Sequence, residues 1–219
     1  MHSQSIAQDY FVLAVTENGM MPVMRKDESN GGLVAAGFMD LLLNNVISEN
    51  KKKITVEGGL IKGLEHLSSL YDYLAEKPRT TEKMMCDYLM STSAKIKQLT
   101  ADIGESLFEK HAVTKEEGGL LGRKTLYVPV NSYKEQTIES LKACITNQKE
   151  TSIQNVALIC ILKETKNLNQ YFSKYESSEL EKKLKELKQN PENKKLAKMV
   201  NYVSDMSAMF FASMVIFNN

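Results

Sequence analysis

The chain has 219 residues and a mass of 24.7 kDa, with 42% apolar and 25% charged residues. These proportions are typical of a soluble globular protein and exclude a disordered, collagen-like or disulfide-scaffold chain. The 28 Lys and Arg residues nearly balance the 27 Asp and Glu residues, so no global field attracts nucleic acid or an anionic surface. Three cations are arginines (Arg25, Arg79 and Arg123), which makes bidentate phosphate clamps scarce.

Apolar spacing in the N-terminal half predicts helices separated by glycine and proline breaks. Residues 5–16 fit a short helix or a strand, and we favour the helix. A polar loop is predicted over 20–30, and Gly31-Gly32 then opens a helix over 33–47 that is apolar on most sides, as expected of a central buried helix. Residues 51–56 fit a short strand. Leucines at helical spacing predict a helix over 60–77, ended by Pro78.

The C-terminal half is predicted to be helical around one hairpin. Thr80 or Thr81 and Ser93 are suited to capping two helices, and residues 113–130 form two β-prone arms around a glycine-rich turn. Helices follow over 131–146, 152–164, 179–189 and from 194 or 195 to about 217. No linker or repeat divides the chain. The prediction is a mainly α, single globular domain over residues 1–219, with a central buried helix and one β-hairpin.

Residue patterns for catalysis and metal binding are missing from the sequence. The cysteines (Cys86, Cys144, Cys160) and histidines (His2, His66, His111) show no ligand spacing, and no phosphate loop, dinucleotide fingerprint or nucleophile elbow occurs. We therefore expect no enzyme, no metal and no cofactor. The N-terminus does not resemble a signal peptide and no apolar run is long enough to cross a membrane, so we expect a cytoplasmic protein.

Two local features leave a membrane role open. Lysines cluster at 51–53, at Lys95 and Lys97, and over 182–198; such clusters are usually solvated, with contact to anionic head groups as the alternative. The apolar loop Met20–Met24 precedes Arg25 and Lys26. Packing across the domain is favoured for this loop, and shallow membrane insertion is the alternative.

The order of elements over 80–130 also fits a winged helix-turn-helix. The helix that would read DNA carries Lys95 and Lys97 but continues with Asp102, Glu105 and Glu109. Because these carboxylates repel a phosphate backbone, nucleic acid is an unlikely partner and remains the weakest alternative.

Four segments in order resemble the Golgi phosphoprotein 3 family, in particular its compact bacterial members. They are YFVLAV at 10–15 followed by Glu17-Asn18-Gly19, GLVAAGFMDLLL at 32–43 ending in Asn45-Val46-Ile47, IGESLFEKHAVT at 103–114 leading into the hairpin, and the apolar C-terminal helix. The resemblance covers about residues 6–217. It implies a mostly α-helical domain whose hairpin can take part in self-association.

The resemblance also implies a peripheral-membrane adaptor that binds phosphatidylinositol 4-phosphate. The family's head-group pocket uses a tryptophan before the central helix, an arginine near that helix's start and two basic residues before the hairpin. Here Met24 or Arg25 lies near the tryptophan position, Val34 replaces the arginine, and the two basic positions fall on Lys97 and Thr100. Lys97, Arg25 and Lys95 are therefore the candidate contacts for an anionic head group.

The sequence thus predicts a non-enzymatic peripheral-membrane or adaptor module that binds anionic phospholipid, phosphatidylinositol 4-phosphate by resemblance. One alternative is a protein-interaction scaffold that self-associates through the hairpin at 113–130 and does not recognise lipid. The other is the winged-helix nucleic-acid binder.

Overall fold

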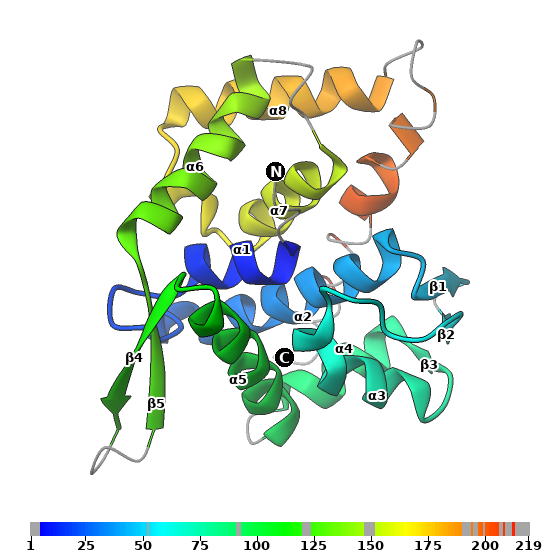
Figure 1. The fold of residues 1–219 in the computed structure, drawn as a ribbon. Coiled ribbons are helices and arrows are strands. Elements are labelled where there is room, and N and C mark those ends of the chain that lie inside the picture. The colour runs from blue at the N-terminus through cyan, green and yellow to red at the C-terminus, as the bar shows by residue number, and fades with distance from the viewer. Residues whose placement is uncertain are drawn as a thin grey trace.

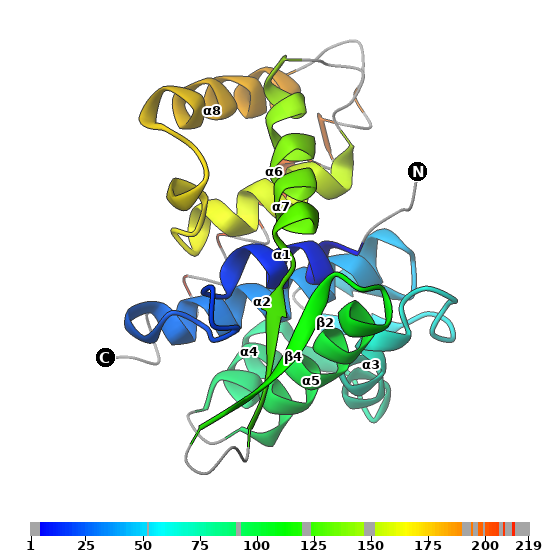
Figure 2. The same ribbon diagram turned by 60° about the vertical axis from the view of Figure 1, so that its left-hand side comes forward.

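The computed structural model describes residues 5–51, 53–90, 93–119, 124–146 and 152–189, and near the C-terminus residues 194, 197–198, 200–205, 208 and 212. The predicted mainly α fold class is confirmed. Two helices, α1 (Ile6–Ala14) and α2 (Lys26–Leu43), lie across the middle of the molecule. Helices α6 to α8 lie on one side of this pair, and α3 to α5 with the strands lie on the other (Figures 1 and 2).

The central pair is buried on nearly all sides, as the sequence predicted for the second helix. Every residue of α1 is buried, and so is most of α2 from Ser29 to Leu41. Helix α2 nevertheless begins at Lys26, several residues before the predicted start. The Gly31-Gly32 pair lies inside the helix. Glycine is required at position 32 because a Cβ there would stand 2.1 Å from the Tyr10 hydroxyl oxygen. This glycine permits close packing of α1 on α2 and does not mark a helix end.

A small sheet and three helices form one flank. Strands β1 (Ile47–Asn50), β2 (Lys53–Val56) and β3 (Arg79–Thr80) pair antiparallel, so the structure has a second small sheet besides the predicted hairpin. The predicted helix over 60–77 is shorter: a 3-10 turn, η2 (Glu65–Leu67), leads into α3 (Ser68–Ala75). Gly63 has a φ of +95°, a conformation that cannot continue a helix, which explains the late start.

Local capping fixes the next two helices where the sequence placed them. Helix α4 (Thr81–Leu89) begins after Thr80, whose hydroxyl accepts a hydrogen bond from the backbone of Lys83. Helix α5 (Ala94–Glu109) begins after Ser93, whose hydroxyl accepts from the backbone of Lys95. The predicted hairpin follows as β4 (Val113–Gly118) and β5 (Lys124–Pro129), paired antiparallel, and it projects from the lower left of the molecule in both views.

The other flank contains α6 (Asn131–Thr146), α7 (Ile153–Glu164), the 3-10 turn η5 (Leu168–Gln170) and α8 (Lys174–Gln189). Helix α8 begins five residues before the prediction. Ser173 and Glu176 explain the start, because each side chain accepts a hydrogen bond from the other's backbone N–H, which forms a capping box. Residues 200–205 are helical, whereas most of the predicted C-terminal helix beyond them lies outside the described residues.

Buried side chains from both flanks join α1 and α2 in one contiguous hydrophobic core. Within the described part of the chain, no helix has the length and apolar character needed to cross a membrane.

Candidate lipid-binding site

The loop before α2 exposes three apolar side chains, Met20, Val23 and Met24, of which Val23 and Met24 are the most exposed and are called here the apolar tip. These two residues belong to the 3-10 turn η1 (Val23–Arg25), and their side chains are 87% and 92% exposed. Only the neighbouring Met21 packs against the core. The prediction that this loop packs across the domain is therefore wrong for the tip, since both of its side chains are exposed to solvent.

Arg25 fixes the base of the apolar tip to the far flank of the molecule. Its Nη1 donates a hydrogen bond to the carbonyl oxygen of Lys166, at 2.6 Å. Lys166 follows the end of α7 with a φ of +58°, a left-handed conformation typical of helix ends. A guanidinium beside the carbonyl groups of a helix C-terminus is electrostatically favourable. Arg25 therefore has a structural partner in addition to any ligand.

A buried polar contact supports this junction from inside. The Asn167 amide donates to the hydroxyl oxygens of Tyr10, Ser29 and Thr165, at 3.1 to 3.4 Å. The Tyr10 hydroxyl in turn donates to the Ser29 carbonyl, at 3.1 Å. The start of α2, the end of α7 and the middle of α1 are thereby joined directly beneath the tip.

Lys95 and Lys97 lie on opposite sides of α5. Two residues on a helix are separated by about 200° around its axis, so these two ammonium groups point apart. Lys97 shares its side of α5 with Gly104, seven residues later. A Cβ on Gly104 would stand 2.4 Å from the Tyr127 ring of β5. Lys97 is therefore on the hairpin side of α5, and it is exposed.

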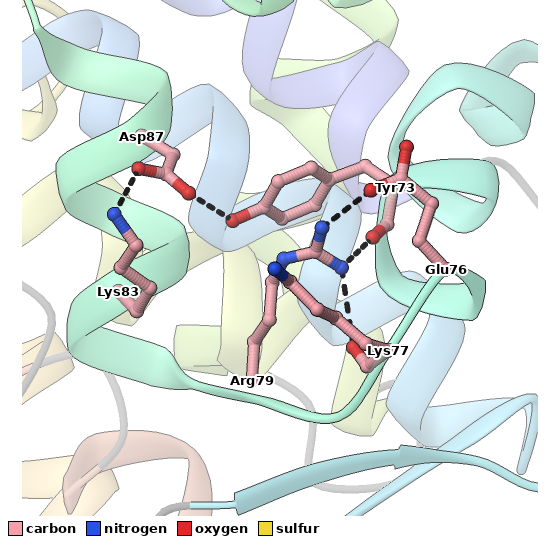
Figure 3. Close-up of polar contacts among 6 residues, drawn as sticks. All are labelled: Tyr73, Glu76, Lys77, Arg79, Lys83 and Asp87. Atoms are coloured by element: carbon pink, nitrogen blue, oxygen red, sulfur yellow. Dashed lines mark hydrogen bonds and ion pairs between the residues drawn. The ribbon is translucent and has the colours of Figure 1, made fainter.

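Lys95 lies beside Tyr73 of α3, which is the centre of a charged cluster formed with Arg79, Lys83 and Asp87. Figure 3 shows the cluster without Lys95. The Lys95 Nζ lies 5.6 Å from the centre of the Tyr73 ring, while the Arg79 guanidinium stacks on the same ring at 3.9 Å. The Tyr73 hydroxyl donates to Asp87 at 2.8 Å, and Lys83 pairs with the other oxygen of Asp87 at 2.7 Å. Burial, together with the contact with Asp87, raises the pKa of Tyr73.

Arg79 is tied into the same cluster by its backbone neighbours. Its guanidinium donates to the carbonyl oxygens of Tyr73 and Lys77, and it pairs with Glu76 at 2.5 Å. Because the Arg79 side chain is buried and these acceptors surround it, this arginine holds α3 against β3.

The three predicted head-group residues thus have different surroundings. Arg25 bonds to the end of α7, Lys95 lies over Tyr73, and Lys97 lies on the hairpin side of α5. The contacts found within the described chain join none of these three side chains to another. Of the other family positions, Val34 is fully buried in α2, and the Thr100 hydroxyl donates to the Ile96 carbonyl at 2.7 Å.

A second polar cluster, which the sequence analysis did not identify, surrounds the start of α1. The Asp40 carboxylate of α2 accepts hydrogen bonds from the Ser5 hydroxyl at 2.5 Å and from the backbone N–H groups of Ile6 and Ala7, both at 2.9 Å. His66 contacts the Ser5 hydroxyl through Nε2 at 2.8 Å. A lone aspartate within the apolar run FMDLLL was the available signal, because a buried carboxylate needs donors.

This cluster stabilises the fold and lacks the geometry of a catalytic triad. In a triad the imidazole lies between serine and carboxylate, whereas here the Ser5 hydroxyl lies between His66 and Asp40. Burial raises the pKa of Asp40 to about 6, against the effect of its donors. Burial, with the nearby Lys110, lowers the pKa of His66 to about 4, so the imidazole is neutral at physiological pH.

The described residues therefore define a mainly α protein with a projecting hairpin, an exposed apolar tip and separate basic groups. A family model described as Golgi phosphoprotein 3 (GPP34) matches residues 6–203, and the chain belongs to this family. Comparison with curated proteins gives no significant match.

Proposed function

We propose that this protein is a non-enzymatic adaptor that attaches peripherally to the cytoplasmic face of an anionic membrane through its apolar tip. The observation that carries this proposal is the exposure of Val23 and Met24 directly before Arg25 and Lys26. Two neighbouring apolar side chains held out in solvent beside cations suit insertion at the head-group boundary.

The expected attachment is reversible. Burying the side chains of Val23 and Met24 in the bilayer contributes about 1.5 to 3 kcal/mol each. Each cation near an anionic surface adds about 1 kcal/mol. Arg25 and Lys26 directly follow the tip in the chain, and Lys97 is exposed on the hairpin side of α5. Lys95, on the other side of α5, adds to the general attraction.

The lipid partner in this proposal is an anionic phospholipid, with phosphatidylinositol 4-phosphate taken from the family resemblance. Val34 and Thr100 occupy two of the family's basic positions and supply no charge. A monoester phosphate is held best by several charge-assisted bonds, preferably from arginine. We therefore expect the negative charge of the surface to matter more than the identity of the head group.

Vesicle co-sedimentation tests the proposal. The protein is mixed with neutral, phosphatidylglycerol and phosphatidylinositol 4-phosphate vesicles at low and at physiological salt. We expect the double variant Val23→Ser/Met24→Ser to lose at least tenfold in vesicle affinity, and Lys97→Ala to lose less. Tyr175→Ser is the matched control, because Tyr175 is 74% exposed but lies on α8, which is apart from the loop before α2 in Figure 2. Equal pelleting of the tip variant and the wild type would overturn the proposal.

Self-association through the hairpin is the second candidate, and the free edge of β4 favours it. The Val130 N–H donates to the Ala112 carbonyl, so these two residues form a hydrogen-bonded pair. Hydrogen-bonded and non-hydrogen-bonded pairs alternate along an antiparallel ladder, and the N–H groups of Lys115 and Glu117 therefore point away from β5. Such an edge can pair with a strand of another copy. Light scattering of the wild type and of Glu117→Pro tests this, and a dimer that persists unchanged in the variant would refute it.

The nucleic-acid alternative gains no comparable support. Glu105, near the C-terminal end of α5, accepts hydrogen bonds from Lys115 and Tyr127 of the hairpin at 2.6 and 2.7 Å. The hairpin is therefore bonded to the acidic part of α5, and these carboxylates line the face that would approach a phosphate backbone.

A further inference from the structure

A cavity of about 250 Å³ lies between α7, η5 and α8, and none of its lining residues belongs to the apolar tip or the hairpin. Figure 2 shows α8 above α7, with the segment that contains η5 joining them at one end. The lining residues of α8 recur at i, i+3, i+4 and i+7, which is the spacing of one helix face: Ser177, Leu180, Glu181 and Leu184.

Four aliphatic side chains form the floor of this cavity: Ile159, Leu168, Leu180 and Leu184. The first three are only 2 to 4% exposed, and Leu184 is half-buried. Protein interiors are close-packed and hold few voids larger than a water molecule. A space of this size with aliphatic walls therefore suits the apolar part of a ligand.

The mouth of the cavity is charged. Lys163 of α7 pairs with Glu181 of α8 at 2.7 Å, and their side chains are 47% and 57% exposed. Lys185 follows Glu181 by one turn of α8 and is also exposed. The hydrogen bond from Lys163, with a smaller effect of Lys185, holds the pKa of Glu181 below its usual range. Two ammonium groups and one carboxylate give the mouth a net positive charge, which favours an anionic end group on the ligand.

The volume of the cavity limits the ligand to one aliphatic chain. A cavity of about 150 Å³ in another protein holds benzene, so by proportion this one accommodates about ten carbon atoms. A leucine side chain of a partner protein would fill less than half of that space. The two long chains of a membrane phospholipid would exceed it.

We propose that this cavity binds the single aliphatic chain of an anionic amphiphile, such as a fatty acid of about ten carbon atoms, with its charged end beside Lys163. Asn169 and Ser177 add polar groups to the lining that can form hydrogen bonds with the ligand. Because an exposed ion pair contributes little to stability, Lys163 can turn from Glu181 to the ligand at small cost.

A titration of methyl-labelled wild-type protein with sodium decanoate, below the concentration at which it forms micelles, tests the proposal by NMR. We expect saturable shifts of the methyl signals of the four floor residues, with one molecule bound per chain. Acetate has the same end group without the chain, and decyltrimethylammonium has the chain with the opposite charge. Both should bind at least about fivefold more weakly than decanoate. Dihexanoyl phosphatidylglycerol, which has two chains, should also bind more weakly.

Variants of the lining provide a second measurement by calorimetry. Leu184→Trp should lower the decanoate affinity by at least about tenfold, because the indole takes the space of the chain. Leu89→Trp is the matched control, since Leu89 is a half-buried leucine on α4 and its replacement should leave the affinity within about twofold. Lys163→Gln should lower the affinity by about fivefold, the effect of one exposed charge.

Three outcomes would overturn the proposal. They are methyl shifts confined to residues outside the cavity, such as Val23, equal binding of decanoate and of either decyltrimethylammonium or dihexanoyl phosphatidylglycerol, and equal affinity of the two tryptophan variants. The wild-type titration does not depend on any variant folding. Vesicle binding by the apolar tip is measured separately, so failure of the cavity proposal leaves the membrane proposal standing.

Discussion

Replacing Asp40 with alanine should destabilise the protein by about 3 to 5 kcal/mol. The substitution leaves the Ser5 hydroxyl and the N–H groups of Ile6 and Ala7 without their acceptor in a buried site. A buried donor that loses its acceptor costs about 1 to 3 kcal/mol, and some relaxation around the smaller side chain reduces the sum. This loss is a large part of the 5 to 15 kcal/mol that is usual for a folded protein.

Urea unfolding followed by circular dichroism at pH 7.5 measures the effect with Asp40 ionised. Asp40→Asn keeps the shape and one acceptor oxygen, so it should cost about 1 to 2 kcal/mol. Asp27→Ala is the matched control, because Asp27 is an exposed aspartate in the first turn of the same helix and its loss should cost less than about 1 kcal/mol. If Asp40→Ala is as stable as Asp27→Ala, Asp40 does not stabilise the start of α1 as we argue.

Two further outcomes follow from the packing and titration of the core. Gly32→Ala should lower the free energy of unfolding by about 1 to 3 kcal/mol, because its Cβ would overlap the Tyr10 hydroxyl. Gly58→Ala is the control, since its Cβ meets open space, and it should change the free energy of unfolding by less than about 0.5 kcal/mol. Equal effects of the two substitutions in thermal unfolding would contradict the packing argument. His66 should titrate near pH 4 by proton NMR. Its contribution to stability is present above pH 6.5 and should be lost as the pH falls toward 4, because the unfolded chain binds the proton at a higher pH than the folded chain does. A midpoint above 6 in the folded protein would contradict the burial of this imidazole.

Local signals in the sequence predicted most element boundaries correctly. The predicted capping residues Thr80 and Ser93 mark the starts of α4 and α5, because each side chain bonds to a backbone N–H within three residues. The start of α2 was wrong, since the role of Gly32 depends on Tyr10, which lies more than 20 residues away and packs against it only in the folded chain.

The candidate site was less accessible to sequence reasoning. The apolar loop residues gave no sign of which side chains would be exposed, and the partner of Arg25 is a backbone carbonyl 141 residues away. No pattern of side chains in a sequence predicts which backbone carbonyl will accept a hydrogen bond from an arginine. In contrast, helical periodicity places Lys95 and Lys97 on opposite sides of a helix, so this result could have been predicted once α5 was predicted.

The burial of α1 has a consequence for how the chain folds during synthesis. All nine residues of α1 are buried, and part of the surface that covers them is α7, which begins at Ile153. At about 5 to 20 residues per second, a ribosome needs roughly 8 to 30 s to extend the chain from α1 to α7. During that interval the apolar face of α1 that belongs against α7 remains uncovered. The newly made N-terminal half is therefore the part of this protein that most needs protection from aggregation before the polypeptide is complete.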